Sequence, residues 1–494
     1  MTYNAAAWLV DRHVTAGDGD RLAVVCGDRR LTYDDLQRQV WRAQNALAAL
    51  GVRRTERVAM VVDDEPGWLA WFLGALRSGV VPVPLSTMLT KAELSPIIDD
   101  AVARVVVASA RHADKAGASV VIDGDDWGGF DDVEEVLAAP TKEDSPAFWL
   151  YSSGTTGVPK GVMHRHANLE ATARCFGEGV LEIRPDDRFL CVPKLFFAYG
   201  LGSTMTFPFA VGGTAILNPD PSSPAGLARI VEAENPTMLA LGPGFIAAML
   251  DAGLPAELLS SVRLATSAGE SLPADLHRRF TEHFGVPLLD ALGTTEALHC
   301  FLANAPGRER PGTSGTPVPG YDLMLRDDED TLVTEPDTPG FLHVRGPSIA
   351  TGYWSRTEAT QAAFRGEWLR TGDVYTRSAD GYWTFLGRNS DMIKAGGIWV
   401  SPAEVESVLV AHPDVLEAAV VGDRDAQGLE LVVAVVVPRA GHTVDAAVLE
   451  AHCRERMAAF KRPRKVVVVE ALPKTATGKI RRFALRDALA AHEL

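Results

Sequence analysis

A loop rich in small, hydroxylic and cationic side chains follows the apolar run Ala147–Tyr151. It extends from Ser152 to Gly161 with the sequence SSGTTGVPKG, in which Lys160 is the cation. Glycines let several backbone N–H groups point at one anion, hydroxyls add donors, and a lysine adds a mobile positive charge, so these residue types suit a polyphosphate. The loop lacks the spacing of a Walker A motif. By composition alone, a Ser/Gly turn without a ligand explains it equally well.

The same string resembles the phosphate loop of the adenylate-forming superfamily, which comprises acyl-CoA synthetases, luciferases and peptide-synthetase adenylation domains. Later segments are similar to that superfamily in the same order, so the resemblance covers nearly the whole chain. They are Ser267–Glu270, Asp290–Glu296, Arg370–Asp373, Gly387–Arg388 and Pro473–Arg481. The resemblance implies an α/β domain over residues 1–388, with layered parallel or mixed sheets, helices and a distorted β-barrel-like part. A small, mobile α+β domain over residues 389–494 would follow, with Ser390 as the hinge.

The resemblance also implies how ATP and Mg²⁺ are bound. Glu296 would hold Mg²⁺, an ion that takes few protein carboxylates when phosphate oxygens complete its shell; taken alone, it would be interpreted as a solvated or capping acid. The segment Ser267–Glu270 would line the adenine, and Asp373 would accept hydrogen bonds from both ribose hydroxyls, which suits a carboxylate. Lys479 would bridge the substrate carboxylate and the α-phosphate, and so would be catalytic together with Lys160 and Glu296. The implied nucleotide-binding residues are Ser152, Ser153, Gly154, Thr155, Thr156, Gly157, Lys160, Ala268, Gly269, Glu270, Asp290, Ala291, Leu292, Gly293, Thr294, Thr295, Asp373, Arg388 and Lys479.

These segments together predict an acid–thiol ligase. A carboxylate is a poor electrophile, and attack on the α-phosphorus of ATP converts it into an acyl-AMP with a good leaving group, while cations neutralise the approaching charges. By resemblance, the C-terminal domain then rotates about Ser390 and the thiol of coenzyme A attacks the acyl carbon. A pantetheine arm can pass a backbone without Cβ atoms, which Gly396 and Gly397 would provide, although a hairpin turn also explains that pair. Phe460 and Lys461 are candidates for contact with CoA.

Two segments, Lys194–Gly202 and Glu296–Asn304, resemble benzoate–CoA ligases more closely than the superfamily at large. By that resemblance they line an acyl pocket suited to a flat ring. The candidate lining residues are Phe197, Ala198, Tyr199, Gly293, Leu298, His299 and Cys300. Core packing is the alternative for one or two of the aromatic residues Phe196, Phe197 and Tyr199. His299 either bonds a ring hydroxyl or amino group or is a hydrogen-bonded pocket histidine. Cys300 is smaller than the branched residue expected there, which admits a substituted benzoate or a bulkier acid.

Hydrophobic periodicity predicts the elements that carry these segments. Apolar residues at three- and four-residue steps indicate a helix over Leu36–Leu50, and apolar runs at Arg57–Asp63, Val80–Leu85 and Arg104–Ala108 indicate strands. Such alternation predicts parallel sheets covered on both faces, and we expect it to continue to about Gly387. After Arg388 the pattern predicts a small α+β unit with strands at 416–421, 431–437 and 465–469 and helices near 403–410 and 445–457.

Composition limits the classes of function. With 48 basic and 64 acidic side chains the formal charge is −16, which disfavours a nucleic-acid partner. No signal peptide or membrane-spanning stretch is predicted, so we expect a cytoplasmic protein without membrane insertion; a homodimer is compatible with the sequence. The five cysteines are widely spaced and are predicted to be reduced, buried side chains. Two alternatives remain: an adenylating enzyme that loads a carrier-protein phosphopantetheine, and a nucleotide-binding relative without catalysis.

Overall fold

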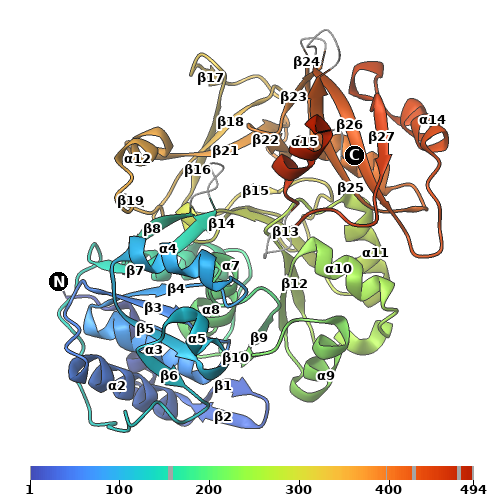
Figure 1. Cartoon of the computed structure of the whole chain (residues 1–494). Helices are drawn as coiled ribbons and strands as arrows, with labels where there is room; N and C mark the ends of the chain where they lie inside the picture. Colours follow the sequence, from blue (N-terminus) through green and yellow to red (C-terminus); the bar gives the residue numbers. More distant parts are fainter. Residues whose placement is uncertain (1, 154–158, 396–397, 425–429, 475–479, 492–494) are drawn as a thin grey trace.

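The computed structural model describes residues 2–153, 159–395, 398–424, 430–474 and 480–491. A nine-stranded mixed sheet forms the centre of the N-terminal part (Figure 1). Its strands from β1 to β13 pair in parallel, apart from the antiparallel edge strand β2, and β14 and β15 extend the other edge antiparallel. In spatial order they are β15 (Thr316–Pro317), β14 (Cys300–Ala303), β13 (Leu288–Gly293), β12 (Leu264–Ser267), β11 (Met238–Leu241), β9 (Arg188–Cys191), β10 (Thr214–Leu217), β1 (Leu22–Cys26) and β2 (Arg29–Thr32).

Three amphipathic helices share one apolar cluster with this sheet, to which Val231, Ile246 and Phe280 contribute. They are α9 (Pro224–Glu234), α10 (Pro243–Asp251) and α11 (Ala274–Phe284). Shorter helical segments lie elsewhere in the N-terminal part. They are η1 (Ala7–Asp11), α1 (Arg12–Thr15), α6 (Ala167–Thr172), η3 (Ala173–Glu178), α7 (Ala198–Leu201), η4 (Gly202–Thr206), α8 (Phe207–Val211) and η5 (Ala256–Leu259).

A second, parallel sheet holds the strands predicted near the N-terminus. In order it contains β4 (Val81–Pro84), β3 (Arg57–Val61), β5 (Ala103–Ser109) and β6 (Val120–Ile122). Helix α3 (Pro66–Ser78) is buried from Pro66 to Arg77, as expected for a helix that is apolar all round. It shares an apolar cluster with α2 (Tyr33–Ala49) and both sheets, while α4 (Lys91–Ala101) and α5 (Ala113–Ala116) pack by a separate cluster. The predicted helix, strands and parallel pairing are confirmed here.

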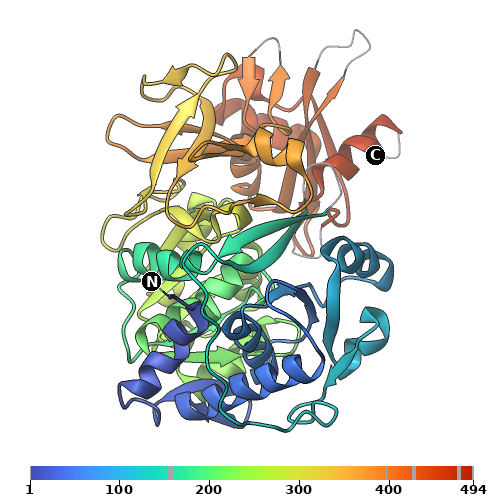
Figure 2. The same cartoon turned by 90° about the vertical axis from the view of Figure 1, so that its left-hand side faces the viewer.

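The described residues of the phosphate-loop segment belong to two antiparallel strands. Strands β7 (Pro146–Ser153) and β8 (Pro159–Arg165) pair with Ser152 opposite Lys160, and β19 (Gly352–Tyr353) adds to the outer side of β8. In Figure 2 this teal hairpin crosses the middle of the molecule, between the blue and green elements below and the yellow and orange elements above.

The expected alternation of strands and helices does not continue to Gly387. Beyond β13 the strands pair antiparallel, with α12 (Thr357–Ala363) as the α-helix of this stretch. They form a six-stranded sheet of β17 (Leu332–Val333), β16 (Asp322–Arg326), β18 (Gly340–Arg345), β21 (Trp368–Arg377), β20 (Phe364–Arg365) and β22 (Trp383–Arg388). The physical reason is connection length: short turns such as Asp327–Thr331 can join only antiparallel neighbours, because a parallel crossover needs a dozen residues or more.

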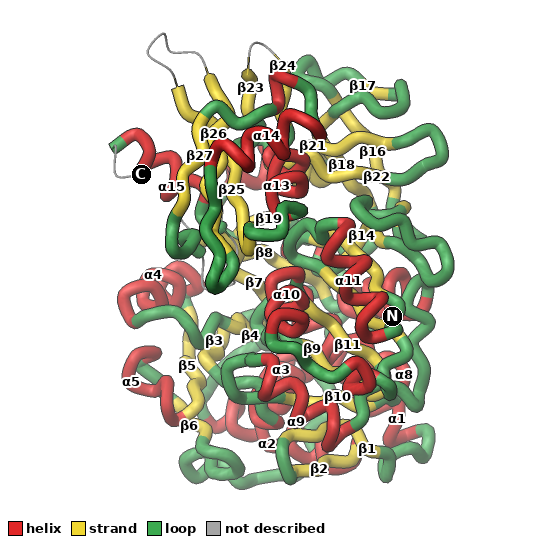
Figure 3. The backbone as a smooth tube through the Cα atoms, turned by 90° about the vertical axis from the view of Figure 1, so that its right-hand side faces the viewer, coloured by secondary structure: helices red, strands yellow, loops and turns green. Residues whose placement is uncertain are grey.

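The C-terminal elements form an α+β unit, as predicted. Strands β25 (Val415–Arg424) and β26 (Glu430–Pro438) pair antiparallel, and β27 (Lys465–Val468) pairs in parallel with β26. One face of the sheet shares a cluster with α13 (Pro402–Val410) and α14 (Ala446–Arg456), and the other packs on α15 (Arg482–Ala490), as Figure 3 shows. A hairpin of β23 (Ile393–Ala395) and β24 (Ile398–Val400) precedes them. The large α/β part with mixed sheets and the small C-terminal α+β part confirm the predicted fold class. Within the described part of the chain, no helix is long and apolar enough to cross a membrane.

Candidate active site

The predicted acyl and adenine segments leave the same edge of the large sheet. Parallel strands β9, β11, β12 and β13 are consecutive neighbours in this sheet, with Ser267 opposite Asp290 in the register. Loops that follow the carboxyl ends of such strands commonly form binding sites. The loop after β9 leads into α7, where the Tyr199 hydroxyl lies 2.6 Å from the Thr266 hydroxyl of β12. This hydrogen bond ties the predicted acyl segment to the strand that leads into the predicted adenine segment.

Lys160, a predicted phosphate-binding residue, and Glu296, the predicted metal ligand, both contact Tyr353, which the sequence analysis did not identify. The Nζ atom of Lys160 lies 5.2 Å from the ring centroid of Tyr353, and the Tyr353 hydroxyl donates a 2.9 Å hydrogen bond to Oε1 of Glu296. Burial, and then the charge of Glu296, raise the pKa of Tyr353, so the phenol stays protonated and can donate. The strand leaving the phosphate loop, β19 and the turn after β13 therefore converge at one place.

The donor set at this point fits Mg²⁺ bound together with a polyphosphate. Glu296 supplies one carboxylate, and in the described segments no cluster of three or more His, Cys, Asp or Glu residues forms a protein cage for a metal. An ion held by a single carboxylate needs oxygens from phosphate and water, which is the usual coordination of Mg²⁺ in nucleotide sites.

The predicted ribose anchor and the predicted arginine face each other across β21 and β22. Asp373 is opposite Arg388 in the register, and Nε of Arg388 lies 2.8 Å from Oδ1 of Asp373. The carboxylate is 1% exposed and the guanidinium side chain 44% exposed, so the pair has one buried and one accessible end. The charge of Asp373 raises the pKa of Arg388 above its usual value. Their contacts with a nucleotide stay predictions.

The predicted adenine segment begins with Ser267, the last residue of β12. Ala268 is buried, and Gly269 has φ +94°, a left-handed conformation that favours glycine. Glu270 is exposed. On the neighbouring strand, burial raises the pKa of Asp290 well above its usual value, which disfavours its charged form.

His299 is the most unusual residue of the predicted acyl pocket. Its side chain lies among the rings of Phe176, Tyr199 and Phe207, with centroid distances of 5.2, 5.5 and 4.7 Å, and a Cβ at Gly202 would collide with it. The residue is 2% exposed, and neither ring nitrogen has a hydrogen-bond partner among the described residues. Burial lowers its pKa to about 3, and the nearby Tyr199 backbone opposes that shift. Whether His299 bonds a substituent of the acid or is hydrogen-bonded within the pocket stays a prediction.

The other pocket candidates have ordinary environments. Phe196 is buried, which confirms core packing for that ring, and it meets the half-buried Phe197 edge to face at 4.5 Å. Ala198 is half-buried on α7, and Leu298 and Cys300 are buried around His299. Cys300 packs in an apolar cluster, and burial raises the pKa of its thiol. All five cysteines are free, and all except the half-buried Cys175 are buried, so the expectation of reduced, buried thiols is confirmed with that exception.

The remaining candidates belong to the C-terminal part or lie outside the described residues. Ser390 is exposed, and its carbonyl accepts a 3.2 Å hydrogen bond from Arg486 of α15. Lys461 forms an ion pair with Glu404 at 2.6 Å and lies 5.7 Å from the Phe460 ring centroid. The predicted residues outside the described part are Gly154, Thr155, Thr156, Gly157, Gly396, Gly397 and Lys479.

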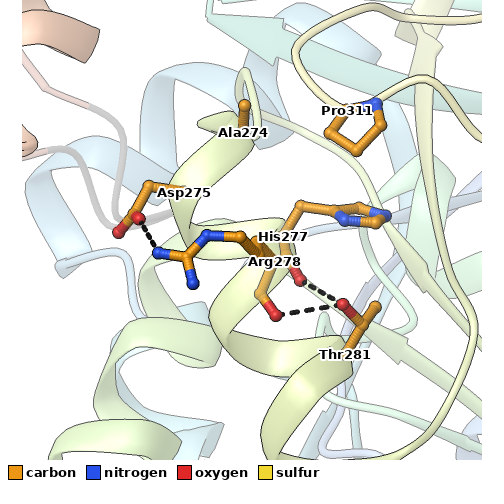
Figure 4. A pocket seen from close by; sticks show the side chains of 6 residues that line it. All are labelled: Ala274, Asp275, His277, Arg278, Thr281 and Pro311. Carbon is orange, nitrogen blue, oxygen red and sulfur yellow. Dashed lines mark hydrogen bonds and ion pairs between the residues drawn. The ribbon is translucent and has the colours of Figure 1, made fainter.

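An open groove of about 460 Å³ beside α11 is separate from these residues (Figure 4). Ala274, Asp275, His277, Arg278, Thr281 and Pro311 line it, and none of them is a predicted site residue. His277 in this groove makes a structural hydrogen bond, because its Nε2 lies 2.8 Å from the Leu288 carbonyl.

Comparisons with known proteins show the family of the chain. Residues 11–354 match the family model of AMP-binding enzymes, and residues 404–479 match that of the AMP-binding enzyme C-terminal domain. The chain is 42% identical to a benzoate–CoA ligase of Thauera aromatica, over 98% of this chain and 96% of that protein. It is 39% identical to a 4-hydroxybenzoate–CoA/benzoate–CoA ligase of Rhodopseudomonas palustris, over 98% and 94%. The crystal structure of the anthranilate–CoA ligase AuaEII in complex with anthranoyl-AMP is similar, with a TM-score of 0.93, 36% identity and coverage of 99% and 98%.

Proposed function

Since the chain belongs to the AMP-binding enzyme family, we propose that it is an ATP- and Mg²⁺-dependent ligase that converts an aryl carboxylic acid into its CoA thioester through an acyl-adenylate. The observation that carries the proposal is the convergence of Lys160, Tyr353 and Glu296 at the edge of the sheet where the predicted acyl segment begins. That convergence supports the proposal because Lys160 would supply a cation and Glu296 a carboxylate for Mg²⁺ next to strand β8, which leaves the phosphate loop.

In the first half-reaction the ionised acid attacks the α-phosphorus of ATP and pyrophosphate leaves. The acid is already a nucleophile, so no general base is required. Lys160 and Lys479 would neutralise the negative charges that approach each other, and Glu296 would hold the Mg²⁺ whose charge stabilises the phosphates. Asp373 and Arg388 would hold the ribose and fix the orientation of the nucleotide.

In the second half-reaction the thiol of CoA attacks the acyl carbon and AMP leaves. We propose that residues 389–494 act as the mobile domain and turn about Ser390 for this step. Lys479 would then leave the site, and Gly396 and Gly397 would line the path of the pantetheine arm. Phe460 and Lys461 are the proposed contacts with the rest of CoA; for Lys461 this requires release from Glu404.

For the acid we propose a benzoate, with a hydroxyl or amino substituent that reaches His299. Among the residues that the structure describes, none is a hydrogen-bond partner of either nitrogen of this buried imidazole, and a polar substituent of the acid would pair with one of them. The similar ligases act, by their names, on benzoate, 4-hydroxybenzoate and anthranilate. A bulkier acid is the alternative that the small side chain of Cys300 leaves open.

The test is a panel of substituted benzoates, cinnamates, medium-chain fatty acids and polycyclic acids, assayed for acid-dependent ATP–pyrophosphate exchange and for AMP formation with free CoA. We expect both activities with aryl acids. Exchange without consumption of CoA would favour a carrier-protein acceptor, and ATP binding without exchange for any acid would contradict catalysis. A cytoplasmic location and a homodimer also belong to the proposal.

A further inference from the structure

Three consecutive backbone carbonyls in the turn that carries Glu296 each accept a hydrogen bond from a distant part of the chain. The turn is η6 (Thr295–Ala297). Nε2 of His164 lies 2.9 Å from the Thr295 carbonyl, the Ala350 amide donates to the Glu296 carbonyl at 2.8 Å, and the Ser348 hydroxyl donates to the Ala297 carbonyl at 2.5 Å. These bonds fix the backbone on which Glu296 sits.

The turn needs such support because it ends in an unfavourable conformation. Leu298 follows it with φ +66°, in a region that branched side chains rarely adopt. Leu298 lies between Glu296, the proposed metal ligand, and His299, the proposed acyl-pocket residue. The backbone conformation of this turn therefore affects the position of both side chains.

His164 can act only as a hydrogen-bond donor toward this turn. A carbonyl accepts and does not donate, so Nε2 carries the proton and Nδ1 has a lone pair. That lone pair accepts from Nδ2 of Asn168 at 3.0 Å, and the same amide donates to the Ser348 carbonyl at 2.8 Å. With its ring buried, His164 has its pKa lowered to about 3 and stays neutral, so its tautomer is fixed.

The position of His164 connects two parts of the proposed site. It lies on β8, four residues after Lys160 and therefore on the same face of the strand that leaves the phosphate loop. Its ring stacks on Phe148 of β7, with centroids 5.0 Å apart and planes at 19°. The phosphate-loop hairpin is thus bonded directly to the turn that carries Glu296.

We propose that His164 is a positioning residue for adenylation: its hydrogen bond to the Thr295 carbonyl holds the turn Thr295–Leu298 in place against the strand that leaves the phosphate loop. This inference rests on the proposed function, because it assigns a role in the first half-reaction. Its mechanical part, the support of the turn, holds independently of catalysis.

The variants His164→Phe and His164→Gln separate the hydrogen bond from the bulk of the ring. Phenylalanine keeps a ring against Phe148 but cannot donate, whereas glutamine retains an N–H donor near the position of Nε2. In the ligand-free protein we expect hydrogen exchange of the peptide covering residues 294–299 to be faster in His164→Phe and close to wild type in His164→Gln. For pyrophosphate exchange we expect about a tenfold loss in His164→Phe and recovery in His164→Gln, as for the loss of one buried hydrogen bond.

Thioester formation from synthetic acyl-AMP and CoA should change less than adenylation, because Glu296 serves the nucleotide phosphates. His277→Phe is the matched control, since it removes a similar bond from a buried histidine to the Leu288 carbonyl outside the proposed site; it should not separate the two half-reactions. If His164→Phe does not fold, Ser348→Ala removes the donor to the Ala297 carbonyl and should give the same pattern.

Unchanged exchange at residues 294–299 in His164→Phe, or equal losses in the two His164 variants, would overturn the inference. Wild-type protein that adenylates no acid would instead overturn the proposed function, and the hydrogen-exchange comparison would still test the support of the turn.

Discussion

Replacing His299 by leucine tests whether the unpaired imidazole selects the acid. The ring is buried among Phe176, Tyr199 and Phe207, and both nitrogens lack partners in the part of the chain that the structure describes. Unsubstituted benzoate would fill the pocket without offering a hydrogen-bond partner to either nitrogen of His299. A hydroxy- or aminobenzoate would pair one of them, whereas leucine presents no polar atom to either acid.

The expected size follows from the cost of an unpaired buried polar group, which is about 1–3 kcal/mol. At about 1.4 kcal/mol per factor of ten, wild type should favour the pairing acid by about 5- to 150-fold in kcat/KM. Burial holds the pKa of His299 at about 3, so the imidazole is neutral and the preference should stay constant between about pH 6 and 8.

The assay compares kcat/KM for each hydroxybenzoate with that for the methylbenzoate of the same substitution pattern, because the two acids are similar in shape. In wild type at least one ring position should show the hydroxyl preference, and in His299→Leu it should disappear. His299→Gln is the control, since an amide can restore one hydrogen bond. Hydroxyl-to-methyl ratios that are identical in wild type and His299→Leu at every position would refute the reasoning.

Three further substitutions test other parts of the site. Cys300→Ile should refill the pocket and raise kcat/KM for benzoate relative to substituted benzoates by about 1–3 kcal/mol equivalent; an unchanged ratio would place Cys300 outside the pocket. Lys479→Ala should nearly abolish acyl-AMP formation and spare thioester formation from synthetic acyl-AMP, and equal loss in both steps would contradict domain rotation. Asp64 accepts the Leu195 amide at 3.2 Å, and burial raises its pKa to about 7. The carboxyl loses its proton near pH 4 in the unfolded chain but keeps it to about pH 7 in the folded protein. The free energy of unfolding of the wild type should therefore fall between these pH values, relative to Asp64→Asn, by up to about 4 kcal/mol as measured by chemical denaturation. Parallel pH curves for the two proteins would contradict the raised pKa.

Local patterns predicted the elements whose burial is uniform or regularly periodic. The helix over Leu36–Leu50 and the strand at Arg57–Asp63 appear as α2 and β3 because each buries a consistent set of apolar side chains. The stretch after β13 was not predicted as antiparallel. Its strands are less uniformly buried than the parallel strands of the large sheet, and the short turns between them determine their direction.

The charged residues of the candidate site were predicted from motifs of side-chain chemistry, but their placement in the structure depends on groups that carry no such signal. Tyr353 bonds Glu296 from a two-residue strand, and His164, Ala350 and Ser348 bond backbone carbonyls, which every residue possesses. A sequence pattern can identify Glu296 as a carboxylate suited to Mg²⁺. The hydrogen bonds to the backbone carbonyls of its turn determine where that carboxylate lies. Because a near-attack geometry tolerates only small displacements, residues that bond this turn should influence adenylation without touching either substrate.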